Sequence, residues 1–148
     1  MIEIRKGEKK DLSSVFELIK ELAVYENGLD QVINSVEKME EDGFGQNPIY
    51  EFIVAVEEGN IIGSAIYYYR YSTWKGKRMY LEDLIVNEPK RGVGAGKLLF
   101  EAIIKIAKNT KCTGMMWQVL DWNEPAINFY KKYKTNFDEE WINCNIDF

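Results

Sequence analysis

One short segment combines a cation with three glycines at alternate positions: Arg91-Gly92-Val93-Gly94-Ala95-Gly96. It follows an apolar run at residues 79–86 that is typical of a β-strand, and it precedes a helical pattern at 97–109. Glycine removes the side chains that would keep a phosphate away from the backbone, and a helix N-terminus presents unpaired N–H groups to an anion. The guanidinium of Arg91 suits phosphate oxygens. The segment therefore predicts a pyrophosphate-binding loop.

The alternative is a tight strand-to-helix connection that binds no ligand. Two familiar nucleotide loops are excluded by spacing. A P-loop needs Ser or Thr after its lysine, and Lys97 is followed by Leu98. The pattern Gly-x-Gly-x-x-Gly, begun at Gly92, would need glycine where Lys97 stands.

Two acids and one tyrosine could supply acid–base chemistry. Glu82 and Asp83 lie on the expected strand that leads into the glycine loop. Neighbouring strand residues point to opposite faces unless a β-bulge intervenes. Either acid could accept a proton from an ammonium or attract a cationic substrate, and a solvated or salt-bridged pair is the alternative. Tyr130, two turns into a helix begun by Asn123 and Pro125, could donate a proton or could be an aromatic core residue.

The composition restricts the chemistry further. The 148 residues include no histidine, which excludes Ser-His-Asp and Cys-His catalysis and the usual zinc sites. Cys112 and Cys144 are too few for a disulfide scaffold or a four-cysteine metal site. A net charge of −5 argues against nucleic acid as a partner. Without a signal-peptide pattern or an apolar run of roughly 20 residues, we expect a cytoplasmic protein that binds no membrane and no metal.

The periodicity predicts one domain, residues 1–148, with an α/β sheet of mixed strand directions, because hairpins and helical crossovers both occur. Asp11 is the expected N-cap of the first helix, and Asn34 with Glu37 resembles a capping box before the second. Glu57-Glu58-Gly59-Asn60 predicts a hairpin. The expected strands are 2–5, 50–56, 61–71, 79–86, 114–119 and 141–146, and the expected helices begin near 11, 35, 97 and 125.

Trp74 differs from the other tryptophans because it lies in an expected turn, residues 72–76. An exposed indole beside carboxylates can hold an ammonium by cation–π attraction. A contact between two copies of the chain is the alternative use.

Five segments together resemble the GNAT superfamily of acetyltransferases, and most closely its diamine (spermidine/spermine) branch and the thialysine N-epsilon-acetyltransferases: residues 18–26, 41–45, 80–83, 91–96 and 122–130. The resemblance runs nearly end to end. It implies a GNAT fold of the α/β (α+β) class, with a mixed central sheet of six to seven strands flanked by about four helices.

The resemblance also implies roles for individual residues. Tyr130 would donate a proton to the coenzyme A thiolate, and Glu82 would assist deprotonation of the amine. The residues that would bind coenzyme A are Leu84, Ile85, Val86, Arg91, Gly92, Val93, Gly94, Ala95, Gly96, Lys97, Asn123, Glu124, Pro125 and Ala126. The residues that would bind the amine are Tyr25, Glu26, Trp74, Glu82, Asp83, Met116, Trp117, Gln118 and a C-terminal acid, Glu139 or Glu140.

The expected activity is transfer of the acetyl group of acetyl-CoA, the co-substrate, to a primary amine of a small cationic molecule by direct attack in a ternary complex. The resemblance also implies a homodimer. Ser72 stands where polyamine-acetylating relatives tend to have an acid, and Lys75 adds a positive charge. These two residues favour a thialysine-like or lysine-like amino acid over a polyamine. A non-catalytic acyl-CoA sensor and a protein N-acetyltransferase are the alternatives.

Overall fold

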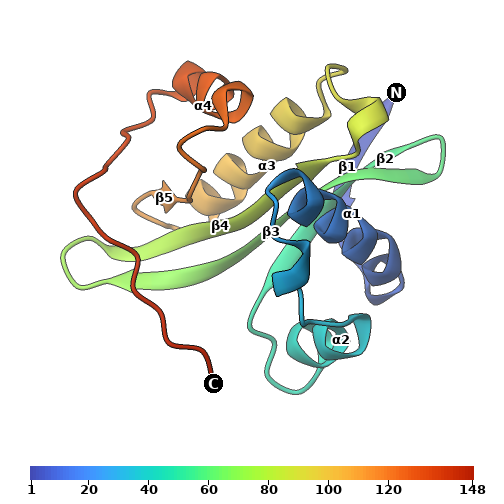
Figure 1. Ribbon diagram of the computed structural model, residues 1–148, viewed down its shortest axis with the longest axis horizontal. Helices are drawn as coiled ribbons and strands as arrows, with labels where there is room; N and C mark the ends of the chain where they lie inside the picture. Colours follow the sequence, from blue (N-terminus) through green and yellow to red (C-terminus); the bar gives the residue numbers. More distant parts are fainter. The chain divides into compact units, whose positions relative to one another are not determined.

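The computed structural model describes residues 1–148 as two compact units, Met1–Gln118 and Val119–Phe148 (Figure 1). No helix combines the length and apolarity needed to cross a membrane. The strands are β1 (Ile2–Lys6), β2 (Glu51–Glu57), β3 (Asn60–Ser72), β4 (Gly76–Val86) and β5 (Met115–Met116). The α-helices are α1 (Leu12–Tyr25), α2 (Val36–Phe44), α3 (Ala95–Asn109) and α4 (Glu124–Tyr130). Four 3₁₀ turns are η1 (Lys9–Asp11), η2 (Leu29–Gln31), η3 (Glu88–Lys90) and η4 (Lys131–Tyr133).

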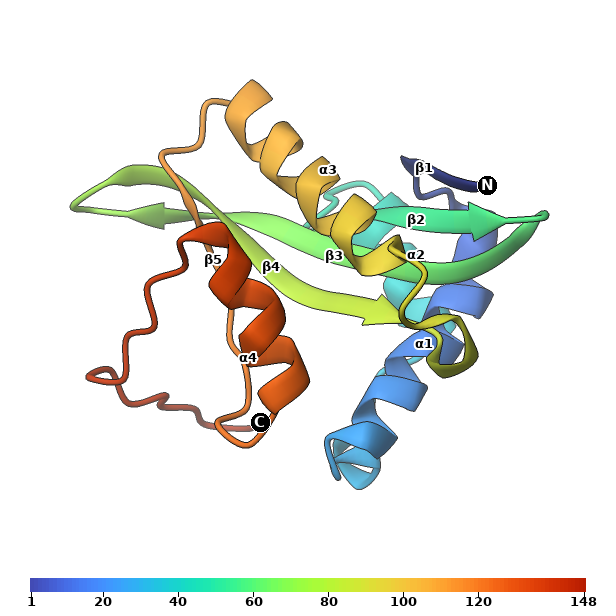
Figure 2. The same cartoon turned by 90° about the horizontal axis from the view of Figure 1, so that it is seen from above.

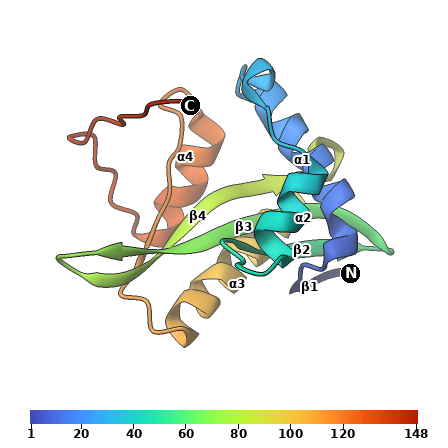
Figure 3. The same ribbon diagram turned by 90° about the horizontal axis from the view of Figure 1, so that it is seen from below.

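The first unit is built on one open sheet with the strand order β1-β2-β3-β4-β5. Strands β1 to β4 pair antiparallel, while β5 pairs parallel to β4. Helices α1 and α2 cover one face of this sheet and α3 covers the other, as Figures 2 and 3 show from opposite sides. The predicted mixed α/β sheet is therefore confirmed.

The predicted number of six to seven strands is wrong, because the sheet has five. The expected strand at 114–119 is reduced to Met115–Met116, and the expected strand at 141–146 is absent. In that last segment Trp141 is 74% exposed and Ile142 is 87% exposed. β-forming residue types favour a strand, but a strand also needs a partner for its N–H and C=O groups, and residues 141–146 have none in a sheet.

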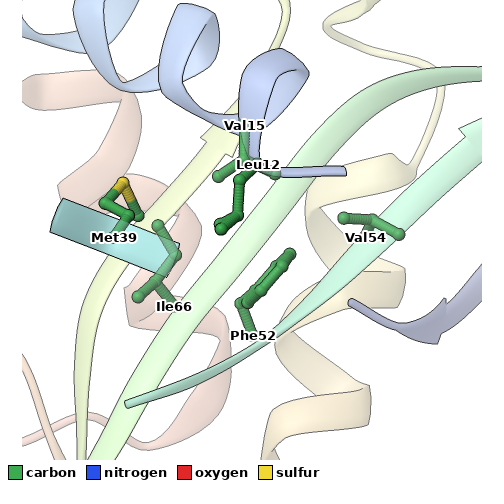
Figure 4. Close-up of a cluster of buried hydrophobic side chains, with 6 residues drawn as sticks. All are labelled: Leu12, Val15, Met39, Phe52, Val54 and Ile66. Carbon is green, nitrogen blue, oxygen red and sulfur yellow. The ribbon is translucent and has the colours of Figure 1, made fainter. Parts of the chain in front are cut away.

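The core under α1 and α2 joins the helices to the sheet. Its buried residues are Leu12, Val15, Met39, Phe52, Val54 and Ile66 (Figure 4). The apolar face of α1 includes Leu12 and Val15, which are completely buried. Packing of this face orients α1 over the sheet, where its most extensive contacts with strands are those with β3 and β4.

One predicted helix cap is confirmed in position, and the other is wrong by one residue. Asp11 is the N-cap residue of α1, as predicted, but its carboxylate accepts no hydrogen bond from that helix. It is buried and accepts both arms of the Arg5 guanidinium, at 2.7 and 3.0 Å, and the backbone N–H of Glu8. The hydrogen bond from Arg5 lowers the pKa of Asp11 despite its burial. At α2 the N-cap is Ser35, one residue after the predicted Asn34. The Oγ of Ser35 accepts the backbone N–H of Lys38.

Candidate active site

A β-bulge in β4 places the two neighbouring acids. Tyr67 of β3 lies opposite Leu81, but the next residue back, Ile66, lies opposite Asp83, so Glu82 is an extra residue in β4. Directly opposed residues of an antiparallel pair share a face of the sheet. Asp83 therefore lies on the face of Ile66, which is the face covered by α1 and α2. The bulge is the exception to strict alternation that the sequence left open.

Tyr68 contacts the neighbouring Glu82 carboxylate. The hydroxyl of Tyr68 donates a hydrogen bond to Glu82 Oε1 at 3.2 Å. The ring of Tyr68 stacks on Tyr80, with centroids 5.2 Å apart. Burial, and then the charge of Glu82, raises the pKa of Tyr68 to about 12, so Tyr68 stays protonated and donates at neutral pH. Glu82 itself is exposed at this edge of the sheet.

Asp83 is in a different electrostatic state from an ordinary surface acid. Its burial raises its pKa to about 7, with further contributions from the negative charges of Glu82 and Glu26. Glu26 follows the last residue of α1, so the tertiary structure brings it to the acids of β4. Near neutral pH Asp83 is therefore partly ionised, which is the condition for accepting a proton from an ammonium.

Beyond the bulge, one edge of β4 has no strand partner. Its pairing with β5 is limited to Met79 opposite Met115 and Tyr80 opposite Met116. Leu84, Ile85 and Val86 follow in β4 and pair on one side only, with β3. An edge of this kind can bind an extended amide chain by backbone hydrogen bonds, as a sheet binds an added strand.

The glycine loop connects this edge to α3. Gly92 and Gly94 have backbone φ angles of 86° and 94°, values that residues other than glycine rarely adopt. Gly94 is the N-cap of α3, and a Cβ added at either glycine would meet no atom within 4 Å. Val93 and Lys97 are exposed, whereas Ala95 is buried at the start of the helix. The loop thus has an open outer side next to a helix N-terminus, which is the arrangement that binds phosphate groups.

Arg91 precedes the loop. Its Nε donates to the backbone oxygen of Val86 at 3.2 Å, and its guanidinium carbon lies 5.2 Å from the centre of the Tyr25 ring. These contacts hold an exposed guanidinium beside the loop. Tyr25, a predicted amine-binding residue, is therefore next to a predicted coenzyme-binding one.

The structure separates some of the predicted amine-binding residues. Trp74 is 85% exposed at the tip of the β3–β4 hairpin. At about 3.3 Å per residue, β4 places this tip roughly 20 Å from Glu82 along the strand. Trp117 packs edge-on against Phe100 of α3, with centroids 5.2 Å apart. Met116 lies opposite Tyr80 in the sheet, and Gln118 is exposed.

Two residues near the acids were not anticipated. Tyr68 donates a hydrogen bond to Glu82, and Arg70, two residues later in β3, donates to the sulfur of Met116. The strand predicted at 61–71 was the available signal, because residues two apart in a strand point to the same face. Their partners in β4 and β5 could be known only from the register.

A hollow of about 630 Å³ lies next to Tyr68 of β3. Tyr68 is part of its lining, so the hollow reaches the side chain that bonds Glu82. Its other lining residues come from the end of α2, the following loop and the adjacent ends of β1, β2 and β3. None of the predicted site residues lines it.

The second unit contains the remaining predicted residues. Asn123 caps α4, since its Oδ1 accepts the N–H of Ala126 at 3.4 Å, and this confirms the predicted cap. Glu124 and Pro125 form the first turn. Tyr130, the last residue of α4, is buried, with its ring edge-on to Phe129. Glu139 and Glu140 are both exposed in the segment after η4.

Comparisons with known proteins identify the class. A model of the "Acetyltransferase (GNAT) family" matches residues 15–134. The thialysine N-epsilon-acetyltransferase of Bos taurus is 38% identical over 136 residues, which cover 86% of this chain and 80% of that protein. A spermidine/spermine N(1)-acetyltransferase-like protein 1 of Homo sapiens is 36% identical over 86% of this chain and 19% of its own length. Among solved structures, an integron cassette protein from the mobile metagenome of V. cholerae has a TM-score of 0.79 and 26% identity, covering 99% of this chain and 93% of its own.

The fold and the sequence similarity together define an acetyltransferase. The chain belongs to the GNAT acetyltransferase family, whose members use acetyl-CoA as co-substrate.

Proposed function

We propose that this enzyme transfers the acetyl group of acetyl-CoA to a primary amine of a small cationic molecule, and that its preferred substrates are thialysine or lysine-like amino acids. The observation that carries the proposal is the bulge, which places a half-buried carboxylate with a pKa of about 7 beside Glu82 on the face of β4 covered by α1. The names of the relatives support the amine class.

The first step of the proposed reaction is deprotonation of the substrate ammonium by the acids of β4. A primary ammonium has a pKa near 10 and must lose a proton before its nitrogen can attack a carbonyl carbon. We assign Glu82 and Asp83 jointly to this step. Glu82, exposed and held by Tyr68, attracts the ammonium, and Asp83 accepts the proton because it is partly ionised near pH 7.

The acetyl donor, acetyl-CoA, is a thioester that must be held next to the amine. We assign the unpaired edge at Leu84, Ile85 and Val86 to the pantetheine arm, and residues 91–97 to the pyrophosphate. Asn123, Glu124, Pro125 and Ala126 are assigned to coenzyme contacts further along on the family resemblance. Tyr130 is assigned the return of a proton to the thiolate when the carbon–sulfur bond breaks, on the same resemblance and on its position at the end of the capped helix α4.

The preference for a short amino acid rests on the hairpin turn. Ser72 Oγ accepts the N–H groups of Trp74 and Lys75, at 3.2 and 3.0 Å, so this hydroxyl is engaged within the turn. A long polyamine gains from carboxylates along its binding groove. Here Ser72 stands in place of an acid and Lys75 adds a positive charge nearby, which disfavours a distal ammonium and suits a substrate with its own carboxylate.

The assembly and location of the protein form the last part of the proposal. We propose that residues 1–148 act as one catalytic domain, because the family match runs from 15 to 134 and so includes parts of both units. A cytoplasmic homodimer is proposed from the resemblance. The exposed Tyr71 and Trp74 at the β3–β4 hairpin supply an apolar contact surface, and the unpaired thiols Cys112 and Cys144 suit a reducing compartment.

The test is an assay of free thiol released from acetyl-CoA, with thialysine, lysine, spermidine and spermine as acceptors. We expect amine-dependent turnover with a rate that rises through about pH 7. Asp83→Asn should remove this rise, whereas Glu3→Gln, an exposed acid on β1, should retain it. Coenzyme binding without turnover on any amine would refute the proposal.

A further inference from the structure

Helix α1 contacts the turn that precedes the glycine loop through the carboxylate of Glu21. The carboxylate of Glu21 accepts two hydrogen bonds from residues more than 60 positions away in the chain. One comes from the backbone N–H of Glu88 at 2.6 Å and the other from the side-chain amide of Asn87 at 2.9 Å. Bonds to an ionised carboxylate are shorter and stronger than those between neutral groups, and Glu88 N–H begins a 3₁₀ turn where it has no helical partner.

The same turn is held from other directions. The backbone N–H of Asn87 donates to Ile62 of β3 at 2.8 Å. Lys90, at the end of η3, pairs with Glu57 of β2 at 2.8 Å. The turn thus has anchors on α1, β2 and β3, and Arg91 follows immediately.

A second residue of α1 acts one helical turn later. Tyr25 is four residues after Glu21, so both side chains project from one side of the helix. The ring of Tyr25 lies 5.2 Å from the guanidinium carbon of Arg91. Successive turns of α1 therefore contact successive parts of the segment that leads into the glycine loop.

We propose that Glu21 is a positioning residue for the coenzyme pyrophosphate. By fixing Asn87 and η3, it sets the point from which Arg91 and the N-terminus of α3 converge on the phosphates. This inference rests on the proposed function, because it assumes that the loop binds coenzyme A. It assigns Glu21 and Tyr25, within the segment 18–26, to binding of the acetyl donor. The next residue, Glu26, instead acts on Asp83, because its negative charge raises the pKa of that acid.

The kinetic test compares two acetyl donors. S-acetylpantetheine has the thioester and the arm but no pyrophosphate, so it does not use the loop. Glu21→Ala should raise the KM for acetyl-CoA about tenfold, equivalent to about 1.4 kcal/mol, with kcat and the KM for the amine within about twofold of the parent. With S-acetylpantetheine the variant and the parent should behave alike.

Two variants control this result. Glu21→Gln keeps an oxygen that can accept the Glu88 N–H, so its KM should lie between those of the parent and Glu21→Ala. Glu17→Ala removes an exposed acid one turn earlier on α1, which pairs with Lys20. This variant should leave the KM for both acetyl donors unchanged. If Glu21→Ala raised the KM for both donors equally, or left the KM for acetyl-CoA unchanged, the assignment of Glu21 would be overturned.

Calorimetry with coenzyme A separates this proposal from the proposed function. If the parent protein acetylates no amine but Glu21→Gln still weakens coenzyme A binding, the reaction assignment fails and the positioning role stands. If the parent turns over and the Glu21 variants bind coenzyme A like the parent, the positioning role fails alone. Glu21→Gln also serves where the alanine variant does not fold.

Discussion

Replacing Asp83 by asparagine should make the protein more stable above neutral pH while it removes activity. Burial, and then the charges of Glu82 and Glu26, raises the pKa of Asp83 from 3.8 to about 7. An acid whose pKa is raised by folding contributes stability that is fully present below its unfolded pKa and is lost as the pH rises through its folded pKa. For Asp83 this loss runs from about pH 4 to about pH 7.

The size of the effect follows from the same values. Each pH unit corresponds to 1.36 kcal/mol, so the difference between 3.8 and about 7 limits the cost of ionising folded Asp83 to about 4 kcal/mol. Asp83 retains some contact with water, and part of the cost is shared with Glu82 and Glu26. We therefore expect Asp83→Asn to raise the free energy of unfolding by about 2 kcal/mol at pH 8 and by much less at pH 4.

Urea unfolding at the two pH values measures this difference, provided that the slope with denaturant is unchanged. Glu3→Gln is the control, because it removes an exposed acid from β1, and it should show no comparable difference between the two pH values. A gain that is the same at pH 4 and pH 8 would show that the amide acts through packing rather than through charge. No gain at pH 8 would mean that Asp83 is ionised without cost, and the reasoning that makes it the proton acceptor would fail.

Three further outcomes are expected. Gly94→Ala should weaken coenzyme A binding in calorimetry. Gly59→Ala, at φ of 78° in the β2–β3 turn with equally open surroundings, should cost similar backbone strain but leave binding intact, and equal affinities in the two variants would remove the loop assignment. Tyr130→Phe should lower kcat by about 10²–10⁴-fold with little effect on coenzyme binding, and a rate within twofold of the parent would make Tyr130 a core residue. Ser72→Asp keeps an acceptor for the turn but adds a negative charge, so the ratio of kcat/KM for spermidine to that for thialysine should rise. A parent enzyme that already prefers spermidine would refute this last argument.

Features that depend on a few adjacent residues could be predicted from the sequence. The glycine loop is one, because the backbone at Gly92 and Gly94 needs φ values that the residue type itself permits. The cap of α4 by Asn123 is another, since the bond to Ala126 spans three positions. The hairpin at 57–60 was also predictable, and its Glu58 and Gly59 both adopt the positive φ of a tight two-residue turn.

The sequence also identified the chemistry without the geometry. The absence of histidine left carboxylates as candidate bases, and Glu82 and Asp83 stood out by their position before the loop. Which of the two is exposed and which has a raised pKa depends on the bulge opposite Ile66 and Tyr67 and on the end of α1. Neither partner is near these acids in the sequence.

Tertiary structure alone decided the rest, because it chose the partners of groups that were locally free to choose. Asp11 had the right type and position for a helix cap, yet its carboxylate binds Arg5. Glu21 gave no local sign of its bonds to Asn87 and Glu88. The residues at 141–146 have strand-forming side chains but no neighbouring strand. A residue type limits which hydrogen bonds and contacts are possible, and only the path of distant segments determines which of them form.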